Sequence, residues 1–158
     1  MTILGDHNQF YIEIPLYVHH VLDKFSDAGY EAYIVGGCVR DALMGKEPND
    51  WDVCTSALPK ETLAVFADEQ TIETGLKHGT VTVLSDENPV EVTTYRIDGE
   101  YLDGRHPEKV EFTRSLEEDL ARRDFTINAM AWSLNGERFG ELVDPFEGMY
   151  DLEDCIIR

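Results

Sequence analysis

Tyr33-Ile34-Val35-Gly36-Gly37-Cys38-Val39-Arg40-Asp41 is the stretch that decides the fold. Its apolar start predicts a strand, its two glycines predict a tight turn, and the residues after them predict a short helix. A second run, Asn49-Asp50-Trp51-Asp52-Val53-Cys54, carries two aspartates. Because side chains alternate between the faces of a strand, Asp50 and Asp52 are expected to point the same way, with Trp51 buried on the other face. The unit predicts a phosphate-binding turn beside a metal site.

Neither half of this pattern is specific alone. Paired glycines are common in turns because glycine adopts positive φ easily, and an Asp-x-Asp pair often caps a helix or lies in a solvated loop. Two carboxylates ~4 Å apart, however, repel each other by roughly 1 kcal/mol in water and about 4 kcal/mol at an effective dielectric constant near 20. A half-buried strand with Asp50 and Asp52 on one face therefore needs a compensating cation, and Mg²⁺ suits carboxylate oxygens.

The two glycines and the helix after them predict an anion site. A helix that starts directly after Gly36-Gly37 points its free amides and positive dipole end at whatever lies over the turn, which suits a triphosphate. Arg40, in the first turn of that helix, adds a positive charge for the same anion. The alternative for Arg40 is a salt bridge to Asp41 or Asp50.

The rest of the chain alternates helical and extended patterns. Apolar residues at helical spacing predict a helix that stops at Gly29, and Ser56 is expected to cap another over residues 59–66. Ser115 begins a further helix, with Glu118 returning to the Ser115 amide. Strands are expected at residues 31–35, 51–54, 80–84, 90–95, 130–134, 139–143 and around Ile156-Ile157, and a loop at 98–113.

Four ordered motifs together resemble the catalytic head of the tRNA nucleotidyltransferases of the CCA-adding and bacterial poly(A) polymerase type, in the polymerase-β-like superfamily. The motifs are Gly36-Gly37-Cys38-Val39-Arg40-Asp41, Asp50-Trp51-Asp52, Glu91-Val92-Thr93-Thr94-Tyr95-Arg96 and Arg122-Arg123-Asp124-Phe125-Thr126-Ile127-Asn128-Ala129. The resemblance implies an α+β nucleotidyltransferase head with a mixed central sheet flanked by helices. We expect residues 1–158 to form that head, with the neck, body and tail domains of the family absent from this chain.

The resemblance also implies roles for individual residues. It makes Asp50, Asp52 and Glu91 the catalytic and metal-binding carboxylates. The alternative for Glu91 is an ordinary solvated strand glutamate. Nucleotide contacts are implied for Gly36, Gly37, Arg40, Arg122, Asp124 and Asn128. For the arginines at 122 and 123, the alternative is pairing with the acidic residues at 117–119.

The reaction implied by the family is nucleotidyl transfer. The 3′-hydroxyl of a tRNA would attack the α-phosphorus of ATP or CTP, two Mg²⁺ ions would assist, and pyrophosphate would leave. Poly(A) synthesis, a catalytically silent nucleotide- or RNA-binding module and a two-metal phosphohydrolase are the alternatives.

Composition limits the partners of this segment. The net charge of −19 over 158 residues repels a polyanion, so the tRNA is expected to be gripped mainly by domains outside this chain. Three cysteines without metal-ligand spacing fit a reducing compartment, and the absence of a signal or membrane-spanning stretch predicts a cytoplasmic protein.

Overall fold

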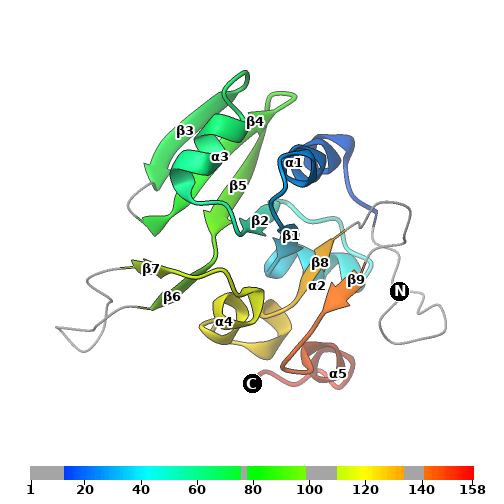
Figure 1. Cartoon of the computed structure of the whole chain (residues 1–158). Coiled ribbons are helices and arrows are strands. Elements are labelled where there is room, and N and C mark those ends of the chain that lie inside the picture. The colour runs from blue at the N-terminus through cyan, green and yellow to red at the C-terminus, as the bar shows by residue number, and fades with distance from the viewer. Residues whose placement is uncertain (1–12, 76–77, 99–109, 134–140) are drawn as a thin grey trace.

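A mixed seven-stranded sheet forms the centre of the molecule in the computed structural model, which describes residues 13–75, 78–98, 110–133 and 141–158 (Figure 1). The strands are β1 (Ala32–Val35), β2 (Asp52–Thr55), β3 (Gln70–Gly75), β4 (Thr80–Ser85), β5 (Asn88–Thr94), β8 (Ala131–Ser133) and β9 (Glu141–Val143), in the order β3-β4-β5-β2-β1-β8-β9. Strands β2 and β5 run parallel, whereas the other neighbours are antiparallel. The predicted α+β class with a mixed central sheet is confirmed.

Short helices and a separate ribbon complete the architecture. The helices are α1 (Leu16–Asp27), α2 (Gly37–Leu43), α3 (Pro59–Val65), α4 (Leu116–Ala121) and α5 (Gly148–Glu153), and the segment η2 (Thr126–Asn128) is a 3₁₀ turn. Strands β6 (Arg96–Asp98) and β7 (Val110–Phe112) pair with each other and extend to one side of the main sheet (Figure 1).

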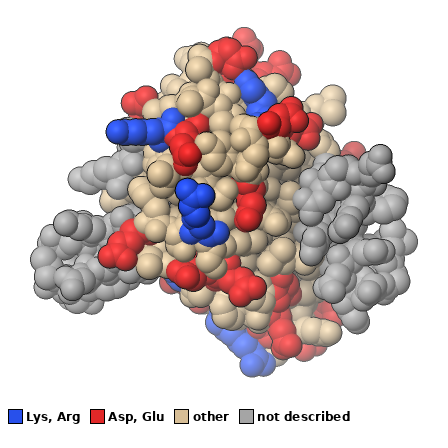
Figure 2. Space-filling view, in the orientation of Figure 1, with Lys and Arg blue, Asp and Glu red and all other residues tan. Residues whose placement is uncertain are grey.

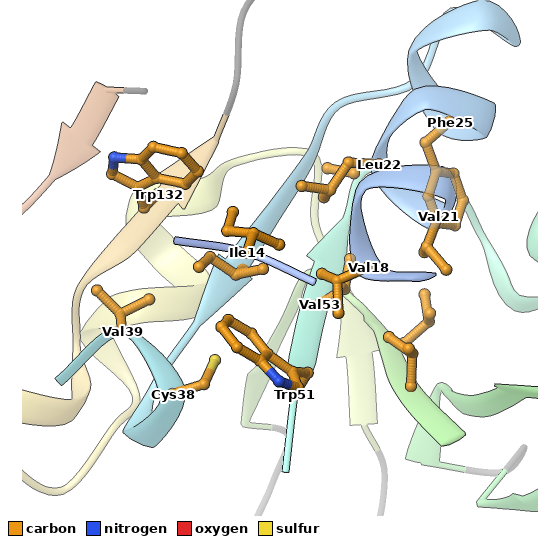
Figure 3. Packing of buried hydrophobic residues seen from close by; sticks show 14 of the residues in the cluster. Ile14, Val18, Val21, Leu22, Phe25, Cys38, Val39, Trp51, Val53 and Trp132 are labelled. Carbon is orange, nitrogen blue, oxygen red and sulfur yellow. The ribbon is translucent and has the colours of Figure 1, made fainter. Parts of the chain in front are cut away.

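The larger hydrophobic core lies between one face of the sheet and helices α1, α2 and α3. In Figure 3, α1 directs Val18, Val21, Leu22 and Phe25 into the core, toward Val53 on β2. All five side chains are at most 5% exposed. The predicted periodicity of α1 is therefore confirmed, and burying each such side chain contributes about 1.5–3 kcal/mol.

A smaller core covers only part of the opposite face of the sheet. There Val35 and Cys54 pack against Tyr95 and against Leu120 of α4. This smaller core includes no described residue of β3 or β4, and Glu91 of β5 is exposed on the same face of the sheet. The sheet therefore presents a partly open face, next to α4, on which charged side chains can lie.

Two predicted helix ends are confirmed by their backbone geometry. Gly29 adopts a φ of 86° just after α1, and Gly45 adopts a φ of 74° just after α2. At the second site the Lys46 amide donates to the Asp41 carbonyl oxygen at 2.9 Å, a bond that closes the helix in a Schellman arrangement. Positive φ explains why glycine stands at both positions.

Two capping predictions are wrong in detail. The Ser56 hydroxyl accepts the Glu31 amide at 3.0 Å, so it connects β1 to the loop after β2. Helix α3 is capped by its own Glu61, which accepts the Leu58 amide at 2.9 Å. At α4, Ser115 accepts the Glu118 amide as predicted, but its own amide donates to Thr113 Oγ1 and not to Glu118.

Several elements differ from the sequence prediction. Strand β3 was not expected, because its polar pattern is typical of a loop; pairing with β4 makes it a strand. Residues 156–158, where a strand was expected around Ile156-Ile157, are irregular, and α5, which the sequence did not predict, precedes them. The expected loop at 98–113 ends in β7, and its residues 99–109 lie outside the described part. The strands predicted at 130–134 and 139–143 are the paired strands β8 and β9, and residues 134–140 lie outside the described part.

Acidic side chains are spread over the face shown in Figure 2, with few basic ones between them. This agrees with the net charge of −19. In the part of the chain that the structure describes, no helix is long and apolar enough to cross a membrane.

Candidate active site

Asp52 and Glu91 are brought together by the parallel pairing of β2 and β5. The two residues are Cα partners in that ladder, and the Glu91 amide donates to the Trp51 carbonyl oxygen at 3.2 Å. Partners in a ladder direct their side chains to the same face of a sheet. Two residues that are 39 positions apart in the sequence therefore form a carboxylate pair on the partly open face.

The Asp52 carboxyl is destabilised in its charged form. Burial, together with the neighbouring carboxylates of Glu91 and Asp50, raises its pKa to about 6. The positive charge of Arg123 opposes these effects. The carboxylates of Asp52 and Glu91 supply the oxygen donors that a divalent cation prefers, so these residues fit a Mg²⁺ ion.

Asp50 does not take the position predicted for it. Strand β2 begins at Asp52, and Asp50 lies in an exposed bend before it, so the strand alternation argument does not apply to this residue. Its charge still acts on Asp52. Within residues 13–75, 78–98, 110–133 and 141–158, no three His, Cys, Asp or Glu side chains converge as a metal-binding group. A cation here would need further oxygens, such as those of a bound phosphate.

The glycine turn approaches the end of η2 closely. Gly36 has a φ of 81° and a ψ of −138°, a conformation almost restricted to glycine. A Cβ at this position would lie 3.2 Å from Arg123 Nη1. The Gly36 amide donates to the Met130 carbonyl oxygen at 3.2 Å, so this amide is already paired, although the resemblance implies a nucleotide contact for Gly36.

Arg40 connects α2 to η2. Its Nη1 donates to Asn128 Oδ1 at 2.8 Å, and its Nε donates to Asp41 Oδ1 at 3.1 Å. The ion pair with Asp41 is the alternative weighed from the sequence, and the Asn128 bond adds a partner 88 residues away. A Cβ on Gly37 would lie 3.3 Å from Arg40 Nη2, so the guanidinium lies directly over the glycine turn.

The segment after α4 forms the other side of this region. A shallow pocket of about 290 Å³ is lined by Arg122, Arg123, Asp124, Phe125 and Asn128. Both arginines also lie near Asp119, at 3.7 Å and 3.8 Å, so the pairing considered from the sequence is present as well. The structure therefore places in one pocket three of the residues predicted to contact the nucleotide, namely Arg122, Asp124 and Asn128.

Arg123 is a candidate site residue that the sequence prediction passed over in favour of Arg122. It is the arginine whose side chain lies against Gly36 and whose charge reaches Asp52. It thus connects the glycine turn, the pocket and the carboxylate pair. Its position in the same motif was the available signal, but the sequence did not distinguish which of two adjacent arginines faces the turn.

Comparison with known proteins gives a consistent family assignment. A family model described as the poly A polymerase head domain matches residues 32–158. The CCA-adding enzyme of Streptococcus gordonii is 51% identical over 138 residues, which cover 87% of this chain and 33% of that enzyme. The CCA-adding enzyme of Lactiplantibacillus plantarum is 49% identical, with 32% of its length covered. This chain therefore spans about a third of the length of the curated relatives it matches.

Solved structures give the same result. The Bacillus stearothermophilus CCA-adding enzyme in complex with CTP aligns with a TM-score of 0.78 and 42% identity, covering 90% of this chain and 32% of that one. A tRNA nucleotidyltransferase complexed with a primer tRNA and an incoming ATP analog aligns with a TM-score of 0.68 and 40% identity, covering 87% and 38% of the two chains.

Proposed function

This chain belongs to the poly A polymerase head domain family, and from that membership we propose that it is the catalytic head of a CCA-adding tRNA nucleotidyltransferase. Residues 1–158 would supply the chemistry, while the remaining two thirds of its relatives' length has no counterpart here. The observation that carries the proposal is the Asp52–Glu91 pair beside a turn flanked by Arg40 and Arg123.

In the proposed reaction, the 3′-oxygen of a tRNA forms a bond to the α-phosphorus of ATP or CTP. The bond from that phosphorus to the bridging oxygen breaks, pyrophosphate leaves and the hydroxyl proton is released. Asp52 and Glu91, with Asp50 near them, would hold Mg²⁺ at the reacting phosphate. When bound, two Mg²⁺ ions would lower the pKa of the attacking hydroxyl and neutralise the triphosphate.

The positive side chains would orient the nucleotide. Arg40 and Arg123 flank the glycine turn, where their guanidinium groups fit phosphate oxygens. Asn128 fixes Arg40 through its 2.8 Å bond. Arg122 and Asp124, which line the neighbouring pocket, would contact the ribose and phosphate side of the nucleotide. These charges would also stabilise pyrophosphate as it departs.

The relatives support the choice of substrates. One solved relative is in complex with CTP, another with a primer tRNA and an incoming ATP analog. We propose the same classes of partner for the protein that contains this chain. The charge of −19 disfavours tight RNA binding by this segment alone, so the tRNA would be held mainly by other parts of such a protein.

Calorimetric titration of the chain with ATP and with dATP tests the proposal. With Mg²⁺ present we expect ATP to bind, dATP to bind more weakly, and the Asp50→Asn, Asp52→Asn double variant to lose binding. Asp23→Asn, an exposed carboxylate change on α1, is the matched control and should bind ATP like the wild type. ATP binding that is independent of Mg²⁺ and of both aspartates would favour the catalytically silent module instead.

Poly(A) synthesis by the same site is the second candidate, because the matching family model describes a poly A polymerase head. Fusing the chain to the missing part of a CCA-adding relative and supplying tRNA that lacks its 3′ end would separate the two. Addition of cytidine and adenosine would support CCA addition, whereas addition of adenosine alone would support poly(A) synthesis. Release of pyrophosphate without RNA extension would indicate a phosphohydrolase.

A further inference from the structure

Asp119 is a buried carboxylate to which the proposed mechanism gives no part. The residue is 1% exposed and lies in α4. Its Oδ1 accepts the Arg96 amide at 2.9 Å, at the start of the β6–β7 ribbon. Its Oδ2 has no hydrogen-bond partner among the described residues. A buried charge is costly unless other groups compensate for it, so its surroundings need an explanation.

Two arginines supply the compensation. Arg122 Nε lies 3.7 Å from Asp119 Oδ1, and Arg123 Nη2 lies 3.8 Å from Asp119 Oδ2. These distances allow an ion pair but are too long for hydrogen bonds. Each oxygen thus has its own arginine. One carboxylate therefore lies within ion-pair distance of both guanidinium groups that line the pocket.

The two arginines have buried hydrogen-bond donors that lack acceptors among the described residues. Arg122 Nε and Arg123 Nε are buried and make no hydrogen bond within the described part of the chain. Leaving a buried donor unpaired costs about 1–3 kcal/mol, and more for a charged group. A phosphate or ribose oxygen entering the pocket would offer the missing acceptors. The two guanidinium groups therefore have hydrogen-bonding capacity that the described residues leave unused.

The position of Arg123 relates Asp119 to the carboxylate pair. Leu120, which follows Asp119 in α4, packs against Cys54 of β2, so this end of α4 lies against the strand that carries Asp52. The charge of Arg123 acts on Asp52 as well, against the burial and the carboxylate repulsion that raise the pKa of Asp52. Arg123 is thus close to Asp119, to the glycine turn and to Asp52.

We propose that Asp119 is a positioning residue of the nucleotide site. It holds Arg122 and Arg123 toward the bound nucleotide and connects them to the Arg96 amide at the start of β6. Asp119 lies too deep to touch the nucleotide itself and acts through the arginines. The inference rests on the proposed function only for the identity of the ligand. The competing account is that Asp119 only accepts the Arg96 amide and leaves the arginines unaffected.

Asp119→Asn separates these accounts, because asparagine keeps an acceptor for the Arg96 amide but removes the charge. We expect binding of ATP with Mg²⁺ to weaken by about tenfold in Asp119→Asn, and by less than about twofold when the same change is made in the Arg122→Ala, Arg123→Ala double variant, which lacks both side chains that Asp119 would position. Glu117→Gln, an exposed change of equal charge on α4, is the control and should bind like the wild type. Equal losses in both backgrounds, or no loss, would overturn the proposal.

A second measurement needs no nucleotide and so stays informative if the chain does not bind ATP. In ¹⁵N NMR of the wild type, the Nε–H groups of Arg122 and Arg123 should be rigid and slow to exchange, and Asp119→Asn should release them. The Nε–H of Arg40, which donates to Asp41, should stay ordered in both proteins. Mobile Arg122 and Arg123 signals in the wild type would refute the positioning role, even if Asp119→Asn did not fold.

Discussion

Asp52 on β2 and Glu91 on β5 are Cα partners in a parallel strand pair, on the face of the sheet that the helical layer leaves partly open. On the opposite face, their neighbours Val53 and Val92 are also partners and are fully buried. The same ladder therefore stabilises the core and places two carboxylates together. Burial of Val53 and Val92 therefore stabilises a strand pairing that also brings the two carboxylates of Asp52 and Glu91 together.

The first prediction concerns the stability of the metal-free protein. Because the folded-state pKa of Asp52 is raised from 3.8 to about 6, the folded state binds a proton that the unfolded state has already lost between these pH values. The stability that Asp52 contributes should therefore be fully present below about pH 4 and be lost as pH rises through 6. Allowing for partial exposure, Asp52→Asn should be about 1–3 kcal/mol more stable than the wild type at pH 8 and equal to it near pH 4.

Urea unfolding in the presence of EDTA measures this difference at each pH. Asp23→Asn, a solvent-exposed aspartate on α1, should show no such pH-dependent gain. A gain for Asp52→Asn of the same size at pH 4 and pH 8 would mean that the carboxylate charge is not its cause.

The second prediction concerns the metal. Mg²⁺ should stabilise the wild type at pH 8, by about 2.7 kcal/mol when the free ion is a hundred times its Kd, because it binds the folded state. Thermal unfolding with increasing Mg²⁺ should show a rising Tm that chelation reverses. The Asp52→Asn protein should show a much smaller rise, and equal rises in both proteins would place the ion elsewhere.

The third prediction separates backbone strain from loss of the site at the glycine turn. Gly36→Ala and Gly45→Ala both place a side chain at a positive φ, of 81° and 74°, at a cost of about 1–3 kcal/mol each. Only the first puts a Cβ against Arg123, whereas Gly45 has open space around it. Gly36→Ala should therefore weaken ATP binding, and Gly45→Ala should lower stability alone. Calorimetry beside urea unfolding tests both, and equal affinities would contradict the assignment of this turn.

The fourth prediction concerns the support beneath η2. A Cβ on Gly148 would overlap the Thr126 carbonyl oxygen, so α5 approaches η2 in a way that only glycine permits. Gly148→Ala should destabilise the fold by about 1–3 kcal/mol through overpacking and displace η2, which carries Asn128. ATP affinity should fall with it.

Glu153→Ala, an exposed change in the same helix, is the control for Gly148→Ala and should leave both quantities near their wild-type values. If Gly148→Ala lost stability but kept full ATP affinity, η2 would not depend on α5 for its position.

The sequence predicted most of what depends on local chemistry. The turn at Gly36-Gly37, the ends of α1 and α2 at Gly29 and Gly45, and the Ser115 cap follow from conformational preference and short-range hydrogen bonding. The paired strands β4 and β5 follow from alternation, with Val81, Val83, Val90 and Val92 buried on one face. Strand β3 was missed because its state depends on pairing with β4, which its polar pattern does not show.

The sequence by itself therefore determined which residue types stand near the site and that the chain resembles a nucleotidyltransferase head. The tertiary structure decided which of them meet. It paired Asp52 with Glu91, left Asp50 outside the strand, joined Arg40 to Asn128 and placed Arg123 against the glycine turn. The physical reason is that these contacts depend on strand register and on the packing of α4 and η2, which residues far apart in the sequence set together.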